Sequence, residues 1–316
     1  MADKKIIAVV GATGAQGGGL ARAILADENS PFAVRALTRN ANSEKAQALA
    51  ALGAEVVQAD IDDAASLTAA FQGAYGAFCV TAFWEHFSPE KELQQAKNMA
   101  EAAEAAGLQH VVWSTLEDTR TWVSLDDDRM PTLMEKYKVP HFDAKGEANA
   151  FFENSNVPAT LLYTSFYWDN MIFFGMNPKP GDDGVLNFVL PMGEAKLPGI
   201  GAADIGKCAY GIFKNPSEFA GKSVGIAGEH LSGAEMASTM SEALGQEVRH
   251  VNVPFDVYRG FGFPGADDLG NMFQFKHDFE DEFRSPRSVE FSRALNPDLQ
   301  SFSDWMKENG KRIPLE

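Results

Sequence analysis

The chain has 316 residues, 45% of them hydrophobic, and its formal net charge at pH 7 is −17. It is long enough to bury a large core, as one large domain or as a domain with a smaller partner. The negative charge disfavours direct binding to nucleic acid, because like charges repel, and no apolar stretch approaches the ~20 residues that a membrane helix requires.

The chain begins with an apolar strand that runs into a glycine-rich turn. Residues 5–10 read Lys-Ile-Ile-Ala-Val-Val, and Gly-Ala-Thr-Gly-Ala-Gln-Gly follows at 11–17. Glycines at this spacing let the backbone turn tightly and approach a pyrophosphate, which the amide groups of a helix predicted at 15–27 would hold. A plain strand-to-helix turn without a ligand is the alternative for such a loop taken alone. The predicted cofactor contacts here are Gly11, Thr13, Gly14, Ala15, Gln16 and Gly17.

The second predicted strand, 33–38, ends at Thr38 and Arg39. A dinucleotide-binding fold places the residue that contacts the adenine ribose here, about 20 residues after the last glycine. A carboxylate would accept a hydrogen bond from a free 2′-hydroxyl, whereas the guanidinium of Arg39 suits a 2′-phosphate. The sequence therefore favours NADP(H) over NAD(H) as cofactor, with Thr38 beside Arg39. Asn40 and Lys45 either add donors to the phosphate or are ordinary solvated residues.

Strands and helices alternate through the first half of the chain. Helices are predicted at 43–52, 64–71 and 89–106, and strands at 55–59, 75–81 and 109–114. Repeated βα units with apolar strands predict a doubly wound, Rossmann-type parallel sheet, which binds ligands at the carboxyl ends of its strands. The residues after the third and fourth strands are therefore further candidate cofactor contacts: Asp60, Ile61, Thr81, Ala82 and Phe83. Ser114 and Thr115 lie at the end of the fifth.

After a helix at 142–152 and a strand at 159–163, the pattern becomes irregular and rich in aromatic residues. Tyr163 ends that strand and is another candidate cofactor contact. Helices follow at 203–214 and 233–244, and an aromatic stretch covers 255–275. We interpret residues 1–155 as an NADP(H)-binding Rossmann domain. Residues 156–316 are interpreted as a smaller α/β lobe on the substrate or partner side, with segments that return to the Rossmann sheet. The aromatic residues are either core or the wall of a pocket.

Cysteines and acidic runs favour a cytoplasmic protein without a metal. Cys79 and Cys208 provide neither a disulfide framework nor metal-ligand spacing. The acidic runs at 60–63 and 126–128 lack the ligand alternation of a calcium loop, so solvated loop acids are favoured over a divalent metal. Nothing marks the chain for secretion.

Three segments of the chain carry a family resemblance. They are the glycine loop with Thr38 and Arg39, the stretch His-Phe-Asp-Ala-Lys-Gly-Glu at 141–147, and GFPGADDLGNMF at 262–273. Together they resemble the NmrA-like family of atypical short-chain dehydrogenases/reductases over essentially the whole chain, and its NADPH-sensing branch most closely. The resemblance implies a protein that binds NADP(H), responds to the redox state and acts through protein partners with little or no turnover.

The catalytic tyrosine of active short-chain reductases has no counterpart at the matching position. Those enzymes carry Tyr-x-x-x-Lys on one helix, where the lysine holds the nicotinamide ribose and lowers the pKa of the phenol. Here Lys145 is present, but His141 stands where the tyrosine would be. Lys145 is predicted to reach a ribose hydroxyl. His141 is either a proton donor or a locally bonded residue at a helix start. A second match, Tyr210 with Lys214, is interpreted as fortuitous.

Two functions stay open. One is an NADP(H)-binding redox sensor or regulator. The other is an NADPH-dependent reductase of a carbonyl, quinone or isoflavone-like molecule, with Lys145 and His141 as candidate catalytic residues. His86, after the fourth strand, either borders the nicotinamide or lies on the surface. Arg39 disfavours a scaffold without cofactor, and the chain is expected to be a monomer or a homodimer.

Overall fold

The computed structural model describes residues 4–315, which form two compact units that interleave along the chain. Unit 1 comprises the described residues of Met1–Asp118, Ala144–Thr164 and Ala203–Val224. Unit 2 comprises those of Thr119–Asp143, Ser165–Ala202 and Gly225–Glu316. The predicted boundary between residues 155 and 156 falls within the second segment of unit 1. The chain therefore passes between the two units five times, and each unit consists of three segments.

Unit 1 is built on a sheet with the strand order β11-β6-β5-β4-β1-β2-β3, seven strands within residues 4–315. The strands are β1 (Lys5–Val9), β2 (Phe32–Thr38), β3 (Glu55–Gln58), β4 (Gly76–Cys79), β5 (His110–Thr115), β6 (Ala159–Tyr163) and β11 (Ser223–Gly225). The pairings among β1 to β6 are parallel. Because the chain moves outward in opposite directions from β1 and β4, the order reverses between them, where such sheets bind ligands. The predicted Rossmann-type fold is confirmed.

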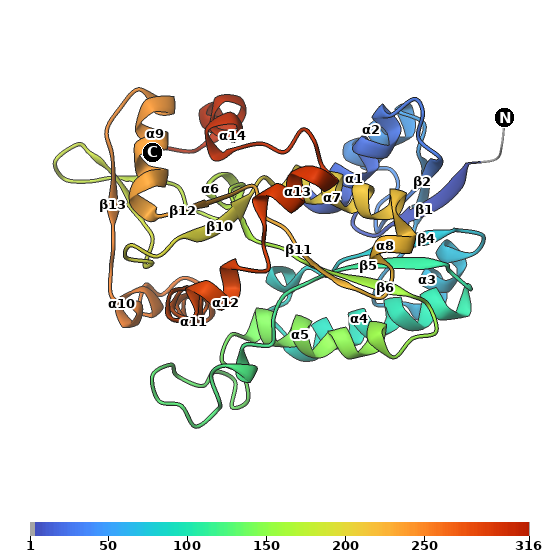
Figure 1. Cartoon of the computed structure of the whole chain (residues 1–316), viewed down its shortest axis with the longest axis horizontal. Coiled ribbons are helices and arrows are strands. Elements are labelled where there is room, and N and C mark those ends of the chain that lie inside the picture. The colour runs from blue at the N-terminus through green and yellow to red at the C-terminus, as the bar shows by residue number, and fades with distance from the viewer. Residues whose placement is uncertain (1–3, 316) are drawn as a thin grey trace. The chain divides into compact units, whose positions relative to one another are not determined.

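Helices cover both faces of this sheet, with α1, α2 and α7 on one face and α3, α4 and α5 on the other (Figure 1). Their bounds are α1 (Ala15–Ala26), α2 (Glu44–Ala51), α3 (Ala64–Phe71), α4 (Pro89–Ala105), α5 (Pro140–Glu153), α7 (Ala202–Lys214) and α8 (Pro216–Phe219), with the 3₁₀ turn η1 (Phe83–Glu85). Polar caps set several of these starts: Ser43 accepts from the amide of Ala46, and Ser88 from that of Lys91. The elements predicted in this unit agree with these bounds to within two residues at each end, and those at 64–71 and 159–163 coincide with α3 and β6.

Burial explains why these strands form. All six residues of β5 are buried, and so are Ile7, Ala8 and Val9 of β1. Strands covered by helices on both faces need such continuous apolar runs. On the face of α3, α4 and α5, the Trp113 ring stacks on that of Phe152 with centroids 4.6 Å apart. The core therefore fixes the carboxyl ends of the central strands.

Unit 2 contains two smaller sheets, ordered β12-β10-β7 and β13-β9-β8. Its strands are β7 (Phe166–Tyr167), β8 (Lys179–Pro180), β9 (Leu186–Val189), β10 (Leu197–Ile200), β12 (Glu229–Leu231) and β13 (Val248–Val251). Its helices are α6 (Asn170–Phe173), α9 (Gly233–Leu244), α10 (Phe255–Arg259), α11 (Ala266–Asp278), α12 (Glu280–Arg284), α13 (Val289–Leu295) and α14 (Phe302–Asn309), with the 3₁₀ turns η2 (Thr119–Thr121) and η3 (Gly310–Arg312). A capping box of Ser232 and Glu235 begins α9, and Gly245 ends it in the left-handed conformation.

The aromatic residues of unit 2 divide between core and surface. Trp168 and Phe273 are buried, whereas Phe173, Phe174 and Phe261 are exposed. The prediction that the aromatic residues belong to the core is therefore confirmed for Trp168 and Phe273 but not for the exposed phenylalanines.

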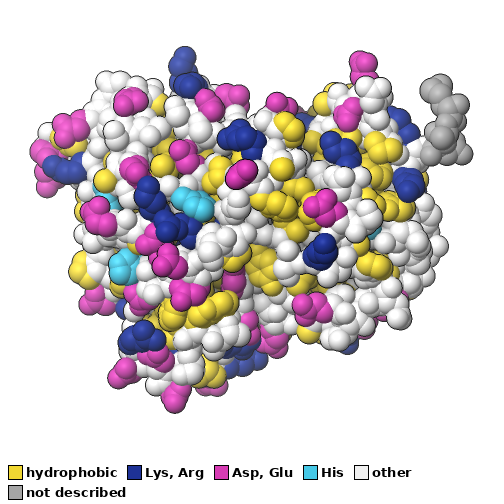
Figure 2. Space-filling view, viewed as in Figure 1, with side chains coloured by type: hydrophobic (Ala, Val, Ile, Leu, Met, Phe, Trp, Pro, Cys, Tyr) yellow, Lys and Arg dark blue, Asp and Glu magenta, His cyan; other side chains and the backbone are white. Residues whose placement is uncertain are grey.

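The surface carries charges of both signs. On the face shown in Figure 2, acidic side chains lie interspersed with lysines and arginines. Within residues 4–315, no helix combines the length and the apolar content needed to cross a membrane.

Candidate functional site

The glycine loop joins β1 to α1 at the carboxyl edge of the unit 1 sheet. Gly11 has a φ of +64°, and its carbonyl oxygen accepts a hydrogen bond of 2.8 Å from the amide of Gly14. A Cβ atom on Gly17 would lie 2.6 Å from that carbonyl oxygen, so no larger residue fits without a shift of the backbone. Gly14 is the N-cap residue of α1 and has no side chain to cap the first turn. The loop thus has the form of an anion cradle at a helix N-terminus.

The other residues of the loop differ in exposure. Ala15 is exposed, Thr13 and Gln16 are half-buried, and the Ser114 hydroxyl donates to Gln16 Oε1 at 2.7 Å. This bond links the loop to the end of β5. The structure therefore brings the glycine loop together with the predicted residue at the fifth strand end.

Arg39 follows β2 directly and forms a two-pronged ion pair with Glu85, the last residue of η1. Its Nη1 lies 2.9 Å from Glu85 Oε2, and its Nη2 donates to Oε1 at 3.0 Å. The two side chains are 66% and 55% exposed. Beside them, Thr38 Oγ1 accepts from the amide of Asn40 at 3.3 Å. The Arg39 guanidinium thus lies at the end of β2, where it was predicted, and its two terminal nitrogens contact the Glu85 carboxylate.

The Asp60–Ile61 loop after β3 is fastened to α4. The carbonyl oxygen of Ile61 accepts from Asn98 Nδ2 at 2.9 Å, and Asp62 Oδ1 accepts from Gln95 Nε2 at 2.8 Å. Asp60 Oδ1 accepts from the amide of Asp62 at 3.0 Å. The loop therefore has a defined shape, and the Asp60 carboxylate takes part in it.

A buried polar cluster lies beyond the end of β4. The Lys145 ammonium lies 2.8 Å from Glu92 Oε1 and donates to Thr81 Oγ1 at 2.5 Å. The Thr81 hydroxyl in turn donates to Glu92 Oε1 at 2.5 Å. His86 Nε2 lies 3.3 Å from Glu92 Oε2, while His86 Nδ1 accepts from the amide of Ser88. The side chains of Lys145 and His86 are each 12% exposed, and that of Glu92 is fully buried.

Glu92 is ionised in this cluster. Burial alone raises the pKa of its carboxyl, but the Lys145 charge, the contact with His86 and the hydrogen bonds from Lys145 and Thr81 hold that pKa at about 2. Glu92 and Lys145 thus form a compensated buried ion pair.

Sequence reasoning missed Glu92, although a signal was present. In the helix at 89–105, Glu92 is in register with the buried stripe of Ala96, Met99 and Ala103. A carboxylate on the apolar face of a helix needs a partner in the core, which is the role that Lys145 fills.

A second chain of hydrogen bonds connects the ends of β5 and β6. Asn149 Oδ1 accepts from Thr115 Oγ1 at 2.7 Å and from Trp113 Nε1 at 3.0 Å, and Asn149 Nδ2 donates to the Tyr163 hydroxyl at 3.1 Å. The Lys145 ammonium lies 5.2 Å from the Trp113 ring. Tyr163 is therefore held at the same sheet edge as the buried cluster.

The loop after β4 also carries Ala82 and Phe83. Ala82 is exposed, whereas Phe83 is buried and packs edge to face against Trp84 and His86. Phe83 is therefore an anchor of this loop.

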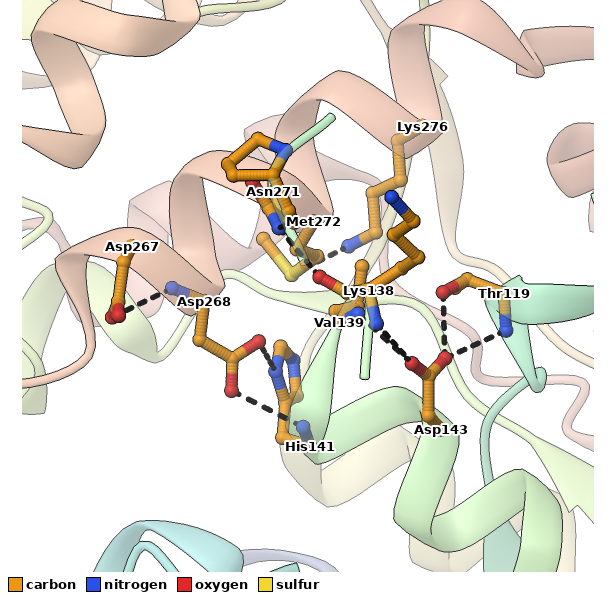
Figure 3. A network of polar contacts seen from close by, with 11 residues as sticks. Thr119, Lys138, Val139, His141, Asp143, Asp267, Asp268, Asn271, Met272 and Lys276 are labelled. Atoms are coloured by element: carbon orange, nitrogen blue, oxygen red, sulfur yellow. Dashed lines mark hydrogen bonds and ion pairs between the residues drawn. The ribbon is translucent and has the colours of Figure 1, made fainter. Parts of the chain in front are cut away.

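His141 lies in the first turn of α5, in the part of that helix that belongs to unit 2. Figure 3 shows its imidazole facing Asp268 of α11. His141 Nδ1 lies 2.6 Å from Asp268 Oδ1, and the His141 amide donates to Oδ2 at 3.1 Å. Both side chains are buried. His141 is thus hydrogen-bonded at the start of α5, but the partner comes from the 262–273 segment and is not a neighbour in the sequence.

Asp143 organises the segment around His141. It accepts bonds from the amide and hydroxyl of Thr119 at 2.8 and 2.6 Å, and from the amides of Lys138 and Val139 at 2.7 and 3.0 Å (Figure 3). Asn271 Nδ2 donates to the Lys138 carbonyl oxygen at 2.6 Å. This network holds the start of α5 in place.

Tyr210 lies at the far end of α1 from the glycine loop. Its hydroxyl donates to Asp27, the C-cap residue of that helix, at 2.7 Å, and the Lys214 ammonium lies over its ring. Burial, followed by the bond to Asp27, raises the pKa of Tyr210 to about 12. The Tyr210 hydroxyl is therefore bonded at the C-terminal end of α1, whereas the glycine loop lies at the N-terminal end.

The described residues contain no group of three or more His, Cys, Asp or Glu side chains suited to a metal ion. Cys79 and Cys208 are both buried free thiols, and burial raises the pKa of each well above its ordinary value.

The fold and the loop define a Rossmann-type α/β protein with an anion cradle beside the switch point of its sheet. A sequence profile described as the NmrA-like family matches residues 3–306, and the chain belongs to that family. The family resemblance carried by the three sequence segments is thereby confirmed.

Known relatives cover nearly the whole chain. The NmrA-like family domain-containing oxidoreductase FrzB of a Cladobotryum species is 30% identical over 315 residues, covering 92% of this chain and 89% of FrzB. The crystal structure of NmrA, a negative transcriptional regulator, in complex with NADP has a TM-score of 0.79 at 24% identity, with 96% and 95% of the two chains covered. Triphenylmethane reductase of Citrobacter sp., complexed with NADP(H), has a TM-score of 0.74 at 19% identity, with 96% and 99% covered.

Proposed function

We propose that this protein binds NADP(H) in unit 1 and acts as a redox sensor or regulator through a protein partner, with little or no turnover. The anion cradle and Arg39 support the choice of cofactor, as do the NADP complexes of the structural neighbours. The neighbour described as a negative transcriptional regulator supports the regulatory role. We place the protein with the NADPH-sensing branch.

The residues of unit 1 fit the parts of this cofactor. The amides of the glycine loop suit the pyrophosphate, and Arg39 suits the 2′-phosphate. Lys145 and Thr81 suit the hydroxyls of the nicotinamide ribose, with Asp60, Ile61 and Tyr163 as further contacts at the same edge. When bound, the cofactor supplies a hydride donor or acceptor.

The observation that carries the regulatory proposal is how the two residues at the Tyr-x-x-x-Lys positions, His141 and Lys145, are bonded. The residue that matches the reductase tyrosine is His141, which is buried and bonded to Asp268. The Lys145 ammonium contacts the buried Glu92 carboxylate and the Thr81 hydroxyl, which fixes its position. Lys145 is therefore suited to holding a ligand.

A reductase is the second candidate function, and one observation favours it. His86, Glu92 and Lys145 form a continuous row of titratable groups beside the proposed site of the nicotinamide ribose. The relative FrzB is named an oxidoreductase.

Calorimetric titration with NADP⁺, NADPH, NAD⁺ and NADH tests the proposal, together with NADPH oxidation against a panel of carbonyls and quinones. We expect NADP(H) to bind and oxidation to stay at background. Arg39→Ala should weaken NADP(H) by ~1.5–3 kcal/mol more than NAD(H), the range for hydrogen bonds to charged groups. The control is Lys97→Ala, an exposed lysine on α4 that also pairs with a carboxylate, Glu101. Turnover that Lys145→Ala abolishes would instead establish the reductase.

A further inference from the structure

The ion pair of Arg39 and Glu85 places a carboxylate where an anionic ligand is expected. Both guanidinium nitrogens of the Arg39 fork contact Glu85, at 2.9 and 3.0 Å. Carboxylate and phosphate groups use this fork in the same two-pronged way. The Glu85 carboxylate therefore stands in for the 2′-phosphate that Arg39 is proposed to bind.

We propose that Glu85 is a specificity-determining residue, which competes with the 2′-phosphate of NADP(H) for Arg39 and limits the preference for NADP(H) over NAD(H). This inference rests on the proposed function, because it assumes that Arg39 contacts the 2′-phosphate. Glu85 acts against NADP(H) in two ways. It occupies the fork of Arg39, and its charge repels the phosphate.

The loop after β4 presents Glu85 in a defined position. Phe83, at the start of η1, is 3% exposed, and its carbonyl oxygen accepts from the amides of His86 and Phe87 at 3.1 and 2.8 Å. The Phe83 ring packs against Trp84 and His86. The backbone that carries Glu85 is thus anchored on both sides, which holds the carboxylate within reach of Arg39.

Because the pair is exposed to solvent, a phosphate group can replace Glu85 as the partner of Arg39. With 66% of Arg39 and 55% of Glu85 accessible, solvent screens the attraction, and such pairs change an equilibrium constant by about fivefold at most. A phosphate that carries more charge than one carboxylate can therefore displace Glu85, which turns into solvent without disturbing the core. The uncharged 2′-hydroxyl of NAD(H) leaves the pair intact.

Calorimetric titration of NADP⁺ and NAD⁺ into the wild type, Glu85→Gln, Arg39→Ala and the double variant tests this competition. We expect Glu85→Gln to bind NADP⁺ about three- to tenfold more tightly while its affinity for NAD⁺ stays within twofold. In the Arg39→Ala background, the same change should give a smaller gain in NADP⁺ affinity, because only the relief of the repulsion is left. High salt should reduce the gain, because it screens both the pair and the repulsion.

The matched control is Glu90→Gln, an exposed carboxylate in the first turn of α4 that contacts the Ser88 hydroxyl. It should leave both affinities within twofold. Circular dichroism confirms folding, and Glu85→Ala should act in the same direction as Glu85→Gln.

Three results overturn the inference. They are an unchanged or weaker NADP⁺ affinity in Glu85→Gln, an equal gain for NAD⁺, and a gain in NADP⁺ affinity that is just as large without Arg39. A wild type that binds neither nucleotide overturns the proposed function itself, and the inference with it. A wild type that binds NADP⁺ while Glu85→Gln gains nothing overturns the inference alone.

Discussion

The buried pair of Glu92 and Lys145 makes the stability of this protein depend on pH in a specific way. Glu92→Gln keeps the size of the side chain and removes its charge, which leaves the Lys145 ammonium without the counter-ion that lies 2.8 Å away. We expect this variant to be less stable than the wild type at neutral pH. The difference should shrink in acid, where the wild-type carboxylate also loses its charge.

The size of the effect follows from the pKa of Glu92. It is about 2 in the folded protein, against an ordinary value of 4.5. At 1.36 kcal/mol per pKa unit, this difference corresponds to about 3 kcal/mol of unfolding free energy. Because the folded-state pKa is the lower one, this stability is fully present above about pH 4.5 and is lost as the pH falls through about 2. By pH 3 about 2 kcal/mol of it has gone.

Urea denaturation of the wild type and Glu92→Gln between pH 7 and pH 3 measures the effect. The difference between the two proteins isolates Glu92, since every other acidic residue is common to both. We expect a difference of about 3 kcal/mol at pH 7 and about 1 kcal/mol at pH 3. The control is Glu101→Gln on the same helix, where the carboxylate is 62% exposed and lies 3.7 Å from Lys97. It should change stability by no more than about 0.5 kcal/mol at any pH.

Two outcomes would refute this reasoning. A difference that stays constant from pH 7 to pH 3 contradicts a depressed pKa at Glu92. Equal stability of the two proteins at pH 7 contradicts a stabilising ion pair.

Two further changes test the glycine loop and the unit 2 network. Gly17→Ala should weaken NADP⁺ at least tenfold and destabilise the fold by about 1–3 kcal/mol, because the new Cβ atom would lie 2.6 Å from the carbonyl oxygen of Gly11. Calorimetry and urea denaturation measure the two effects. The control is Gly310→Ala, whose Cβ atom would approach no heavy atom nearer than 3.4 Å. Comparable losses in that control would contradict the steric argument. Asp268→Asn should cost about 2 kcal/mol, because it weakens the two buried hydrogen bonds to His141, while NADP⁺ affinity stays within twofold because the proposed cofactor contacts belong to unit 1. Thermal unfolding and titration measure this pair of effects, and abolished NADP⁺ binding in a folded Asp268→Asn protein would count against the proposed site.

Local patterns predicted the main sheet well. The apolar run before Gly11, the turn glycines and the following helix depend on residues close together in sequence, and the structure has β1 and α1 at those places. Similarly, the helix predicted at 233–244 is α9, which a capping box begins and Gly245 ends. Such signals are short-range, so they survive in the folded chain.

Two members of the buried polar cluster were selected from the sequence. Thr81 and Lys145 were selected separately, one after the fourth strand and the other on a later helix, and the structure places them 2.5 Å apart. Glu92 and Glu85, which neutralise Lys145 and Arg39, were not predicted. Their partners lie far away in sequence, so no local pattern identifies the pair.

The sequence by itself determined the strand, glycine loop and helix at the start of the chain, the parallel sheet and the family, because periodicity and turn chemistry act over a few residues. Only the tertiary structure decided which polar side chains meet. Helix packing buries Glu92 against Lys145, the loops after β2 and β4 bring Glu85 to Arg39, and α11 supplies Asp268 to His141. Each pair depends on distances between remote segments, and burial or exposure at the meeting point then sets what its charges contribute.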